Sequence, residues 1–178
     1  NMLSYHGANL IFNLSGSNET LGKSQIRRTT VLENSRRNCG AYVYASAGVN
    51  ESTSETVYSG HNIIASCGTL IKETENFSEK SEIIYADIDM NSINFKRRLN
   101  TNFHDLIEFN INYKHVNFHL LNDDEYEFEN KIDETPFIPK GTNEEILDAF
   151  YKVASVQEYA LLKRMKHTNA KIIVIGIS

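Results

Sequence analysis

A strongly acidic stretch followed by two prolines divides this chain into two unequal parts. Residues 122–135 carry seven acidic side chains and one lysine, and Pro136 and Pro139, the only prolines of the sequence, come directly after them. Proline stiffens an extended segment and cannot continue a helix, so we interpret residues 122–141 as a linker. The 178 residues of the chain suffice for a sizeable hydrophobic core.

The part before the linker alternates short apolar runs with helical segments. Glycine and clusters of polar residues bound these runs, as they do at turns. We expect strands at residues 8–14, 41–47, 83–88 and 106–113, helices at 24–38 and 91–99, a polar loop at 48–58, and a hairpin of residues 61–65 and 69–73 joined by Ser66, Cys67 and Gly68. Strands that alternate with helices predict an α/β fold.

The part after the linker holds the clearest helix signal. Thr142 and Glu145 have the spacing of a capping box, in which each side chain satisfies a backbone donor of the first turn. Apolar residues then recur at helical spacing, so we expect an amphipathic helix at 143–167 and a buried strand at 171–175. The helix presents one face made of Ile146, Phe150, Val153, Gln157, Leu161 and Met165.

Charge and hydropathy exclude several classes of protein. The 18 Lys and Arg against 23 Asp and Glu give a net charge of −5, whereas a nucleic-acid-binding protein needs clustered positive charge. No apolar run approaches the roughly 18 residues of a membrane span, and no apolar leader opens the chain. Two cysteines are too few for a disulfide framework. We therefore expect a cytoplasmic protein without nucleic-acid or membrane partners.

The loop after the first strand is a candidate ligand site. Residues 15–17 (Ser-Gly-Ser) and the nearby Lys23 place hydroxyls and an ammonium at the carboxyl end of a strand, where α/β sheets commonly hold ligands. The alternative is a plain strand-to-helix turn in which a serine caps the helix. The following helix also carries four arginines that face either an anion or ion-pair partners: Arg27, Arg28, Arg36 and Arg37.

Cysteine offers a second candidate for chemistry. The charges of Arg36 and Arg37 would lower the pKa of Cys39 and activate it as a nucleophile. The alternative is that Cys39 is a small, partly buried residue at a helix end, and we interpret Cys67 in the hairpin turn in the same way.

The histidines do not predict a metal site. His104, His115 and His119 would need a helix to share one face, but the sequence indicates extended or irregular chain there. His61 lies in an apolar run, where a hydrogen-bonded core histidine is the simpler interpretation. At the end of the chain, a buried strand that runs into Gly176, Ile177 and Ser178 is how a phosphate-binding loop begins.

Two sets of motifs, one on each side of the linker, resemble the glutamine-dependent NAD synthetase family. The first set is GANLIFNLSGS at residues 7–17, Gly22-Lys23, Arg27, Ser35-Arg36, the run from Ala41 to Gly48, Glu51-Ser52-Thr53 and Gly60-His61. The second set is the run from Pro136 to Pro139, Gln157, Leu162-Lys163-Arg164 and the run from Ile173 to Ser178. The resemblance covers nearly the whole chain and is weakest at residues 103–135.

The resemblance implies a fold in pieces. Residues 1–121 would be the carboxyl half of a nitrilase-type glutaminase domain, a partial α-β-β-α sandwich with an arm toward neighbouring subunits. Residues 122–141 would be the linker. Residues 142–178 would begin the synthetase domain, a parallel-sheet domain similar to the adenine-nucleotide α-hydrolases. Assembly into a homo-oligomer through the nitrilase-type domain is also implied.

The resemblance further implies an activity for the intact enzyme. The family hydrolyses glutamine to ammonia and uses ATP and magnesium to amidate nicotinic acid adenine dinucleotide to NAD. Its catalytic Glu, Lys and Cys precede the GANLIFNLSGS motif, so we expect no catalytic residue and no metal ligand in this chain, which by itself would be inactive. A truncated relic or a non-catalytic binding or scaffold module is the alternative. A stand-alone amidase is disfavoured by the linker and the second helix.

The remaining site residues follow from motif positions. Ser17 and Lys23 match positions that contact glutamine in the family, and Arg27 matches a neighbouring basic position. A hydroxyl and an ammonium suit the two charged ends of an amino acid. Gly176, Ile177 and Ser178 match the beginning of the family's ATP-binding loop.

Overall fold

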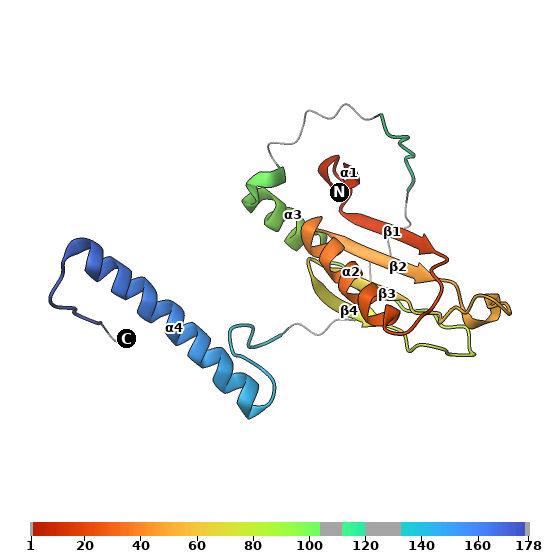
Figure 1. The fold of residues 1–178 in the computed structure, drawn as a ribbon. Coiled ribbons are helices and arrows are strands. Elements are labelled where there is room, and N and C mark those ends of the chain that lie inside the picture. Colours follow the sequence, from red (N-terminus) through yellow and green to blue (C-terminus); the bar gives the residue numbers. More distant parts are fainter. Residues whose placement is uncertain (1, 104–111, 120–132, 177–178) are drawn as a thin grey trace. The chain divides into compact units, whose positions relative to one another are not determined.

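The computed structural model describes residues 2–103, 112–119 and 133–176. The chain folds as two units, residues 1–130 and 131–178, which are treated one at a time below. Figure 1 traces the elements of both units in chain order.

The first unit is built on a four-stranded mixed sheet with the order β1-β2-β3-β4 (Figure 1). β1 (Leu10–Ser15) runs parallel to β2 (Ala41–Ser46), with Leu10 opposite Ala41. β3 (Ile63–Ser66) and β4 (Thr69–Glu73) follow as an antiparallel hairpin beside β2. The predicted α/β class is therefore confirmed.

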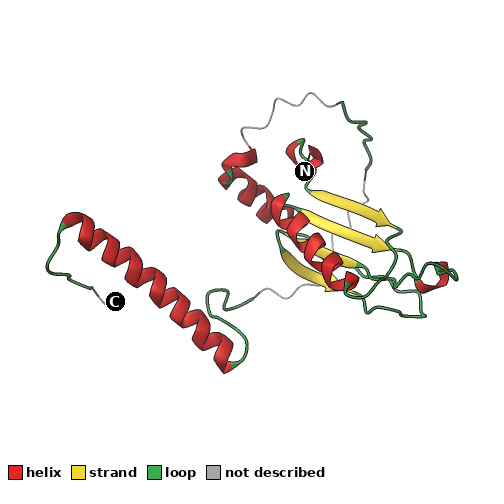
Figure 2. Ribbon diagram, viewed as in Figure 1, coloured by secondary structure: helices red, strands yellow, loops and turns green. Residues whose placement is uncertain are grey.

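A single helix, α2 (Lys23–Arg37), connects the two parallel strands and covers one face of the sheet (Figure 2). Two neighbouring parallel strands need such a crossover connection, because the chain must return to the edge of the sheet where the first strand began before the second strand starts. Side chains alternate across a strand, so every second residue of β2 and β3 points at α2. The core between them consists of Val31, Tyr44, Ile63 and Ala65, with Leu32, Tyr42 and Leu70 packed against it.

Arg97 fastens the helix α3 (Met90–Leu99) to the segments that enter β1 and β2. Its guanidinium donates hydrogen bonds to the carbonyl oxygens of Ala8 at 2.7 Å, Cys39 at 2.8 Å and Asn38 at 3.0 Å. Shorter elements complete the unit: helix α1 (Met2–Tyr5) and the 3-10 helices η1 (Val49–Glu51) and η2 (Thr101–Phe103).

The sheet face opposite α2 remains uncovered at its β1 end by the described residues. Phe12 and Leu14 of β1 point away from the helix, because their neighbours in register are Val43 and Ala45 rather than the core tyrosines. Phe12 is 67% exposed and Leu14 is 84% exposed. An apolar strand face of this kind normally packs against a second layer.

Most predicted elements of the first unit are confirmed, but the strand predicted at 83–88 is wrong. No described residue pairs with this segment, and Ile83 is 89% exposed. A strand exists only through hydrogen bonds to a neighbour, which an apolar run cannot reveal. The strand predicted at 106–113 lies mostly outside the described residues.

The second unit consists of helix α4 (Asn143–Thr168) and short extended segments. The predicted capping box is confirmed, since Thr142 N–H donates to Glu145 Oε2 at 2.8 Å and Glu145 N–H donates to Thr142 Oγ1 at 3.3 Å. No residue of α4 is buried, so its apolar face has no cover within the described residues.

The buried strand predicted at 171–175 is wrong as well. The segment has no strand partner among the described residues, and Val174 is 93% exposed. Among the helices that the structure describes, none combines the length and the apolarity that a bilayer crossing demands.

The core generates a prediction about stability. Ile63→Ala removes a completely buried side chain from the contact with α2. We therefore expect the free energy of unfolding to fall by about 2–5 kcal/mol. Urea unfolding followed by the near-ultraviolet circular dichroism of tyrosine measures this change. Ile83→Ala is the matched control, because the same substitution at an 89% exposed site should leave the midpoint almost unchanged. Equal effects of the two substitutions would contradict the assigned core.

Candidate functional site

A cavity of about 220 Å³ lies between the amino-terminal half of α2 and the strands β1 and β2. Ser17, Lys23 and Arg27, the three residues singled out in the sequence, all line it. Asn13 and Tyr42 contribute a polar floor, where the Asn13 amide donates to the tyrosine hydroxyl at 3.0 Å. The fold therefore brings the predicted residues together in one place.

Lys23 is the first residue of α2, and its ammonium donates to the Asn18 side-chain oxygen at 2.9 Å. This partner is an uncharged amide, and none of the described carboxylates forms an ion pair with Lys23. The residue at the helix start is Gly22, with a φ of 79° and no side-chain cap. The alternative of a serine that caps this helix is therefore wrong.

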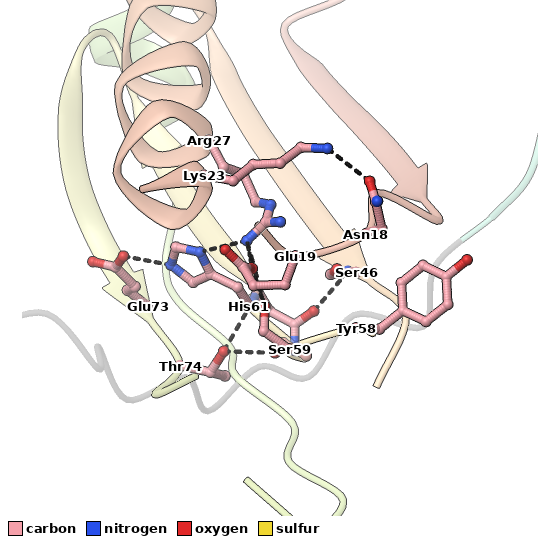
Figure 3. Close-up of polar contacts among 12 residues, drawn as sticks. Asn18, Glu19, Lys23, Arg27, Ser46, Tyr58, Ser59, His61, Glu73 and Thr74 are labelled. Atoms are coloured by element: carbon pink, nitrogen blue, oxygen red, sulfur yellow. Dashed lines mark hydrogen bonds and ion pairs between the residues drawn. The ribbon is translucent and has the colours of Figure 1, made fainter. Parts of the chain in front are cut away.

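Arg27 is buried, with a side chain only 4% exposed, and it pairs with Glu19 (Figure 3). Its Nη1 donates to Glu19 Oε2 at 2.9 Å and lies 3.1 Å from Nδ1 of His61. Since a guanidinium has no acceptor, Nδ1 of His61 accepts this hydrogen bond and the ring proton is on Nε2. That nitrogen then donates to Glu73 Oε1 at 2.5 Å.

Glu19 gathers donors from three segments of the chain (Figure 3). Ser59 Oγ donates to its carboxylate at 2.6 Å, Arg27 donates from α2, and the Ser24 N–H donates from the first turn of that helix. Burial by itself would raise the pKa of Glu19, but the hydrogen bonds from Ser59 and Arg27, the charge of Arg27 and the Ser24 N–H outweigh it and lower the pKa. The carboxylate thus also neutralises the positive end of the helix.

Two nitrogens of Arg27 remain without a partner. Nε and Nη2 are buried and make no hydrogen bond within the described structure, and the guanidinium lies 6.0 Å from the centre of the Tyr44 ring. Buried donors without partners are rare in folded proteins. Because Arg27 lines the cavity, an acceptor group bound there would be in a position to satisfy them.

The other three arginines of α2 are ion-paired rather than free to bind an anion. Arg28 pairs with Glu73 at 2.9 Å. Arg36 and Arg37 both pair with Glu33, and their hydrogen bonds lower the pKa of this carboxyl to about 2. The interpretation of an ion-paired helix face is confirmed for these residues.

Sequence reasoning missed most of the network around Arg27. His61 was expected as a hydrogen-bonded core histidine, and this is confirmed, since it is 2% exposed and contacts Arg27 and Glu73. Glu19 and Ser59 were not identified, because Ser59 lies 40 positions from Glu19 and 32 positions from Arg27. A usable signal was the presence of Ser59 and His61, two polar side chains, directly before an apolar strand.

Cys39 does not have the surroundings of an activated nucleophile. Burial raises the pKa of its thiol, and the nearby Cys67 raises it further, although the charges of Arg97 and Lys96 oppose this. The arginines expected to lower the pKa, Arg36 and Arg37, are held by Glu33 instead. Cys39 is 8% exposed, which agrees with the interpretation of a small buried residue.

Cofactor ligands are sparse in the part of the chain that the structure describes. No group of three metal-ligating side chains occurs within it, and His104 lies outside it. Of the predicted ATP loop, Gly176 is described as irregular chain, whereas Ile177 and Ser178 lie outside the described residues.

The fold and the cavity together define a class of site. A mixed α/β sheet carries, near the carboxyl ends of its parallel strands, a small cavity with one uncompensated ammonium, hydroxyls and unpartnered guanidinium donors. Such an arrangement suits a small ligand with a carboxylate.

Comparisons with known proteins find similar sequences over nearly the whole chain. The glutamine-dependent NAD(+) synthetase of Mycobacterium leprae is 29% identical over 185 residues, which cover 97% of this chain and 26% of that protein. The enzyme of the same name from Mycobacterium bovis is 29% identical over 177 residues, with the same coverage. A crystal structure of a glutamine-dependent NAD(+) synthetase from Cytophaga hutchinsonii matches 43% of this chain and 13% of its own, with 38% identity and a TM-score of 0.41. No family model matches.

The resemblance found in the motifs is thereby confirmed. The chain is similar to glutamine-dependent NAD(+) synthetases over 97% of its residues. It spans about a quarter of the length of these curated relatives.

The buried Glu19–Arg27 pair generates a prediction. Glu19→Gln leaves the arginine charge buried without a counterion, so we expect the free energy of unfolding at neutral pH to fall by about 3 kcal/mol. The pKa of Glu19 is lowered in the folded state, so the stabilisation is complete above the ordinary value of 4.5 and is lost as pH falls through the folded-state pKa. Urea unfolding at pH 7 and at stepwise lower pH measures both effects.

The matched control is Glu33→Gln, which removes a carboxylate that also pairs with arginines of α2 but does so at the surface. Solvent screens that pair, so stability should barely change. A difference between the native protein and Glu19→Gln that stays constant at all pH values would contradict the assigned ionised carboxylate.

Proposed function

We propose that this chain contributes the amino-acid end of the glutamine site in a glutamine-dependent NAD synthetase. The intact enzyme would hydrolyse glutamine and use the ammonia to amidate nicotinic acid adenine dinucleotide to NAD. The observation that carries the proposal is that Ser17, Lys23 and Arg27, chosen by motif position, line one cavity. The similarity to synthetases of this name over 97% of the chain supports it.

Lys23 would provide the charge in this site. Arg27 is neutralised by Glu19 at 2.9 Å, whereas the ammonium of Lys23 donates to the neutral amide of Asn18 and pairs with no described carboxylate. The α-carboxylate of glutamine would therefore be attracted to Lys23, with hydrogen bonds from the free nitrogens of Arg27. The hydroxyl of Ser17 would accept a hydrogen bond from the α-ammonium group.

The role of the chain in this proposal is to bind and orient glutamine rather than to cleave it. Neither thiol lines the cavity, and burial raises the pKa of Cys39. The nucleophile would therefore be supplied by residues other than those of this chain. ATP and magnesium would act in the synthetase part.

The proposed domain organisation follows the same family pattern. Residues 1–121 would form part of the nitrilase-type α-β-β-α sandwich, 122–141 the linker, and 142–178 the start of the synthetase domain. The exposed apolar side chains of Phe12 and Leu14 support a second sheet on that face. Homo-oligomers through the nitrilase-type domain are part of the proposal.

Glutamine binding tests the proposal. We expect the purified 178-residue chain to bind L-glutamine in ligand-observed NMR titrations. Lys23→Met should weaken binding about tenfold or more, because a charge-assisted hydrogen bond contributes about 1.5–3 kcal/mol. Ser17→Ala should weaken it less, since the hydroxyl makes a neutral hydrogen bond to the ligand. Lys163→Met on the exposed surface of α4 is the matched control and should bind like the native chain.

Two results would overturn the proposal. Unchanged affinity in Lys23→Met would remove the cavity from glutamine recognition and favour a binding or scaffold module. Ammonia release from glutamine by the folded chain, abolished in Cys39→Ala, would show that the chain is itself a catalyst.

A further inference from the structure

Cys39 and Cys67 lie next to each other, away from the glutamine cavity. Cys39 follows the end of α2, and Cys67 is the first of the two turn residues between β3 and β4. The Cys67 N–H donates to the carbonyl of Gly40 at 3.0 Å, and Ala41 stands opposite Ser66 in the antiparallel ladder. The two cysteines therefore lie just beyond the paired ends of two adjacent antiparallel strands, Cys39 two residues before β2 and Cys67 one residue after β3.

The thiol of Cys67 is near enough to act on that of Cys39, and both cysteines are free. Cys39 is buried, at 8% exposure, whereas Cys67 is partly exposed. A reagent in solution therefore reaches Cys67 first.

The backbone at both cysteines is unusual. Cys39 has a φ of 41° and Cys67 a φ of 49°, in the left-handed region that normally favours glycine or asparagine. With Gly68 at a φ of 90°, the hairpin has positive φ at both turn residues, where Asn-Gly is the common solution. Turn chemistry does not explain a cysteine at this position.

Two positively charged side chains, Arg97 and Lys96, act on the cysteines. Arg97 donates to the Cys39 carbonyl at 2.8 Å, and its charge acts on both sulfurs. Lys96 acts on Cys39 as well. Cations favour the thiolate, the form that attacks a disulfide, and so offset part of the effect of burial.

We propose that Cys39 and Cys67 form a reversible intrachain disulfide by exchange with a small-molecule disulfide. The Cys67 thiolate attacks one sulfur of the reagent, forms a mixed disulfide and releases one equivalent of reagent thiol. The Cys39 thiol then loses its proton and attacks the Cys67 sulfur, and the second reagent thiol leaves. The two protein thiols are oxidised and the reagent is reduced to two thiols. The bond joins the end of α2 to the β3–β4 turn.

The test uses the reduced 178-residue chain and glutathione disulfide as the oxidant. After acid quenching and alkylation, mass spectrometry should show the loss of two hydrogen atoms and a peptide that links Cys39 to Cys67. The intrachain disulfide should exceed the glutathione adduct by about tenfold or more, because the second thiol is held at high effective concentration. Dithiothreitol should restore both thiols.

Two variants separate the steps. In Cys39→Ser the glutathione adduct on Cys67 should accumulate, because no second thiol displaces it. In Cys67→Ser, at the partly exposed turn, Cys39 should remain unmodified. Circular dichroism checks that each variant is folded. The peptide map of the native chain shows whether Cys39 and Cys67 are linked, and this result does not depend on either variant.

A stable glutathione adduct on Cys67 of the native chain, or disulfides only between chains, would overturn the proposal. Equal adduct formation in the native chain and in Cys39→Ser would also overturn it. None of these outcomes depends on glutamine binding, so the proposed function and this inference can fail separately.

Discussion

The buried ion pair between Arg27 and Glu19 is the constraint on which the rest of the amino-terminal unit depends. Burying two charges is costly unless each finds its partner and further hydrogen bonds. Ser59 and His61 complete these contacts, so the start of α2, the loop before it and the entry to β3 must come together. Because Arg27 lines the cavity, the same contacts fix part of the cavity wall.

The same pair decides how charge is distributed in the cavity. Because Glu19 neutralises Arg27, the uncompensated positive charge belongs to Lys23, which has only an amide partner. In the proposed glutamine site, the attraction for a carboxylate would therefore come from Lys23. The chain spans about a quarter of the length of its curated relatives, and the proposal assigns to it binding residues rather than the nucleophile.

The strand predictions were correct where an apolar run has a neighbouring strand to pair with. The prediction at 83–88 was wrong because the described residues give that run no such neighbour. Ile63 and Ile83 both lie in apolar runs, yet the first is completely buried and the second is 89% exposed. Ile63 has a neighbouring strand on each side, whereas the described residues give Ile83 none. Periodicity reports which residues favour an extended chain, and only long-range pairing makes a sheet.

The sequence by itself determined the local features: the Thr142–Glu145 capping box with its helix, the hairpin turn, the helix between the parallel strands, and the motif positions Ser17 and Lys23. These depend on residues a few positions apart. Only the tertiary structure decided that Arg27, of four arginines on one helix, is buried. It also decided that Cys39 and Cys67 lie close together. The burial of Arg27 depends in part on Ser59 and His61, which lie 32 and 34 positions away, and the cysteines come from separate turns, so no local pattern encodes either outcome.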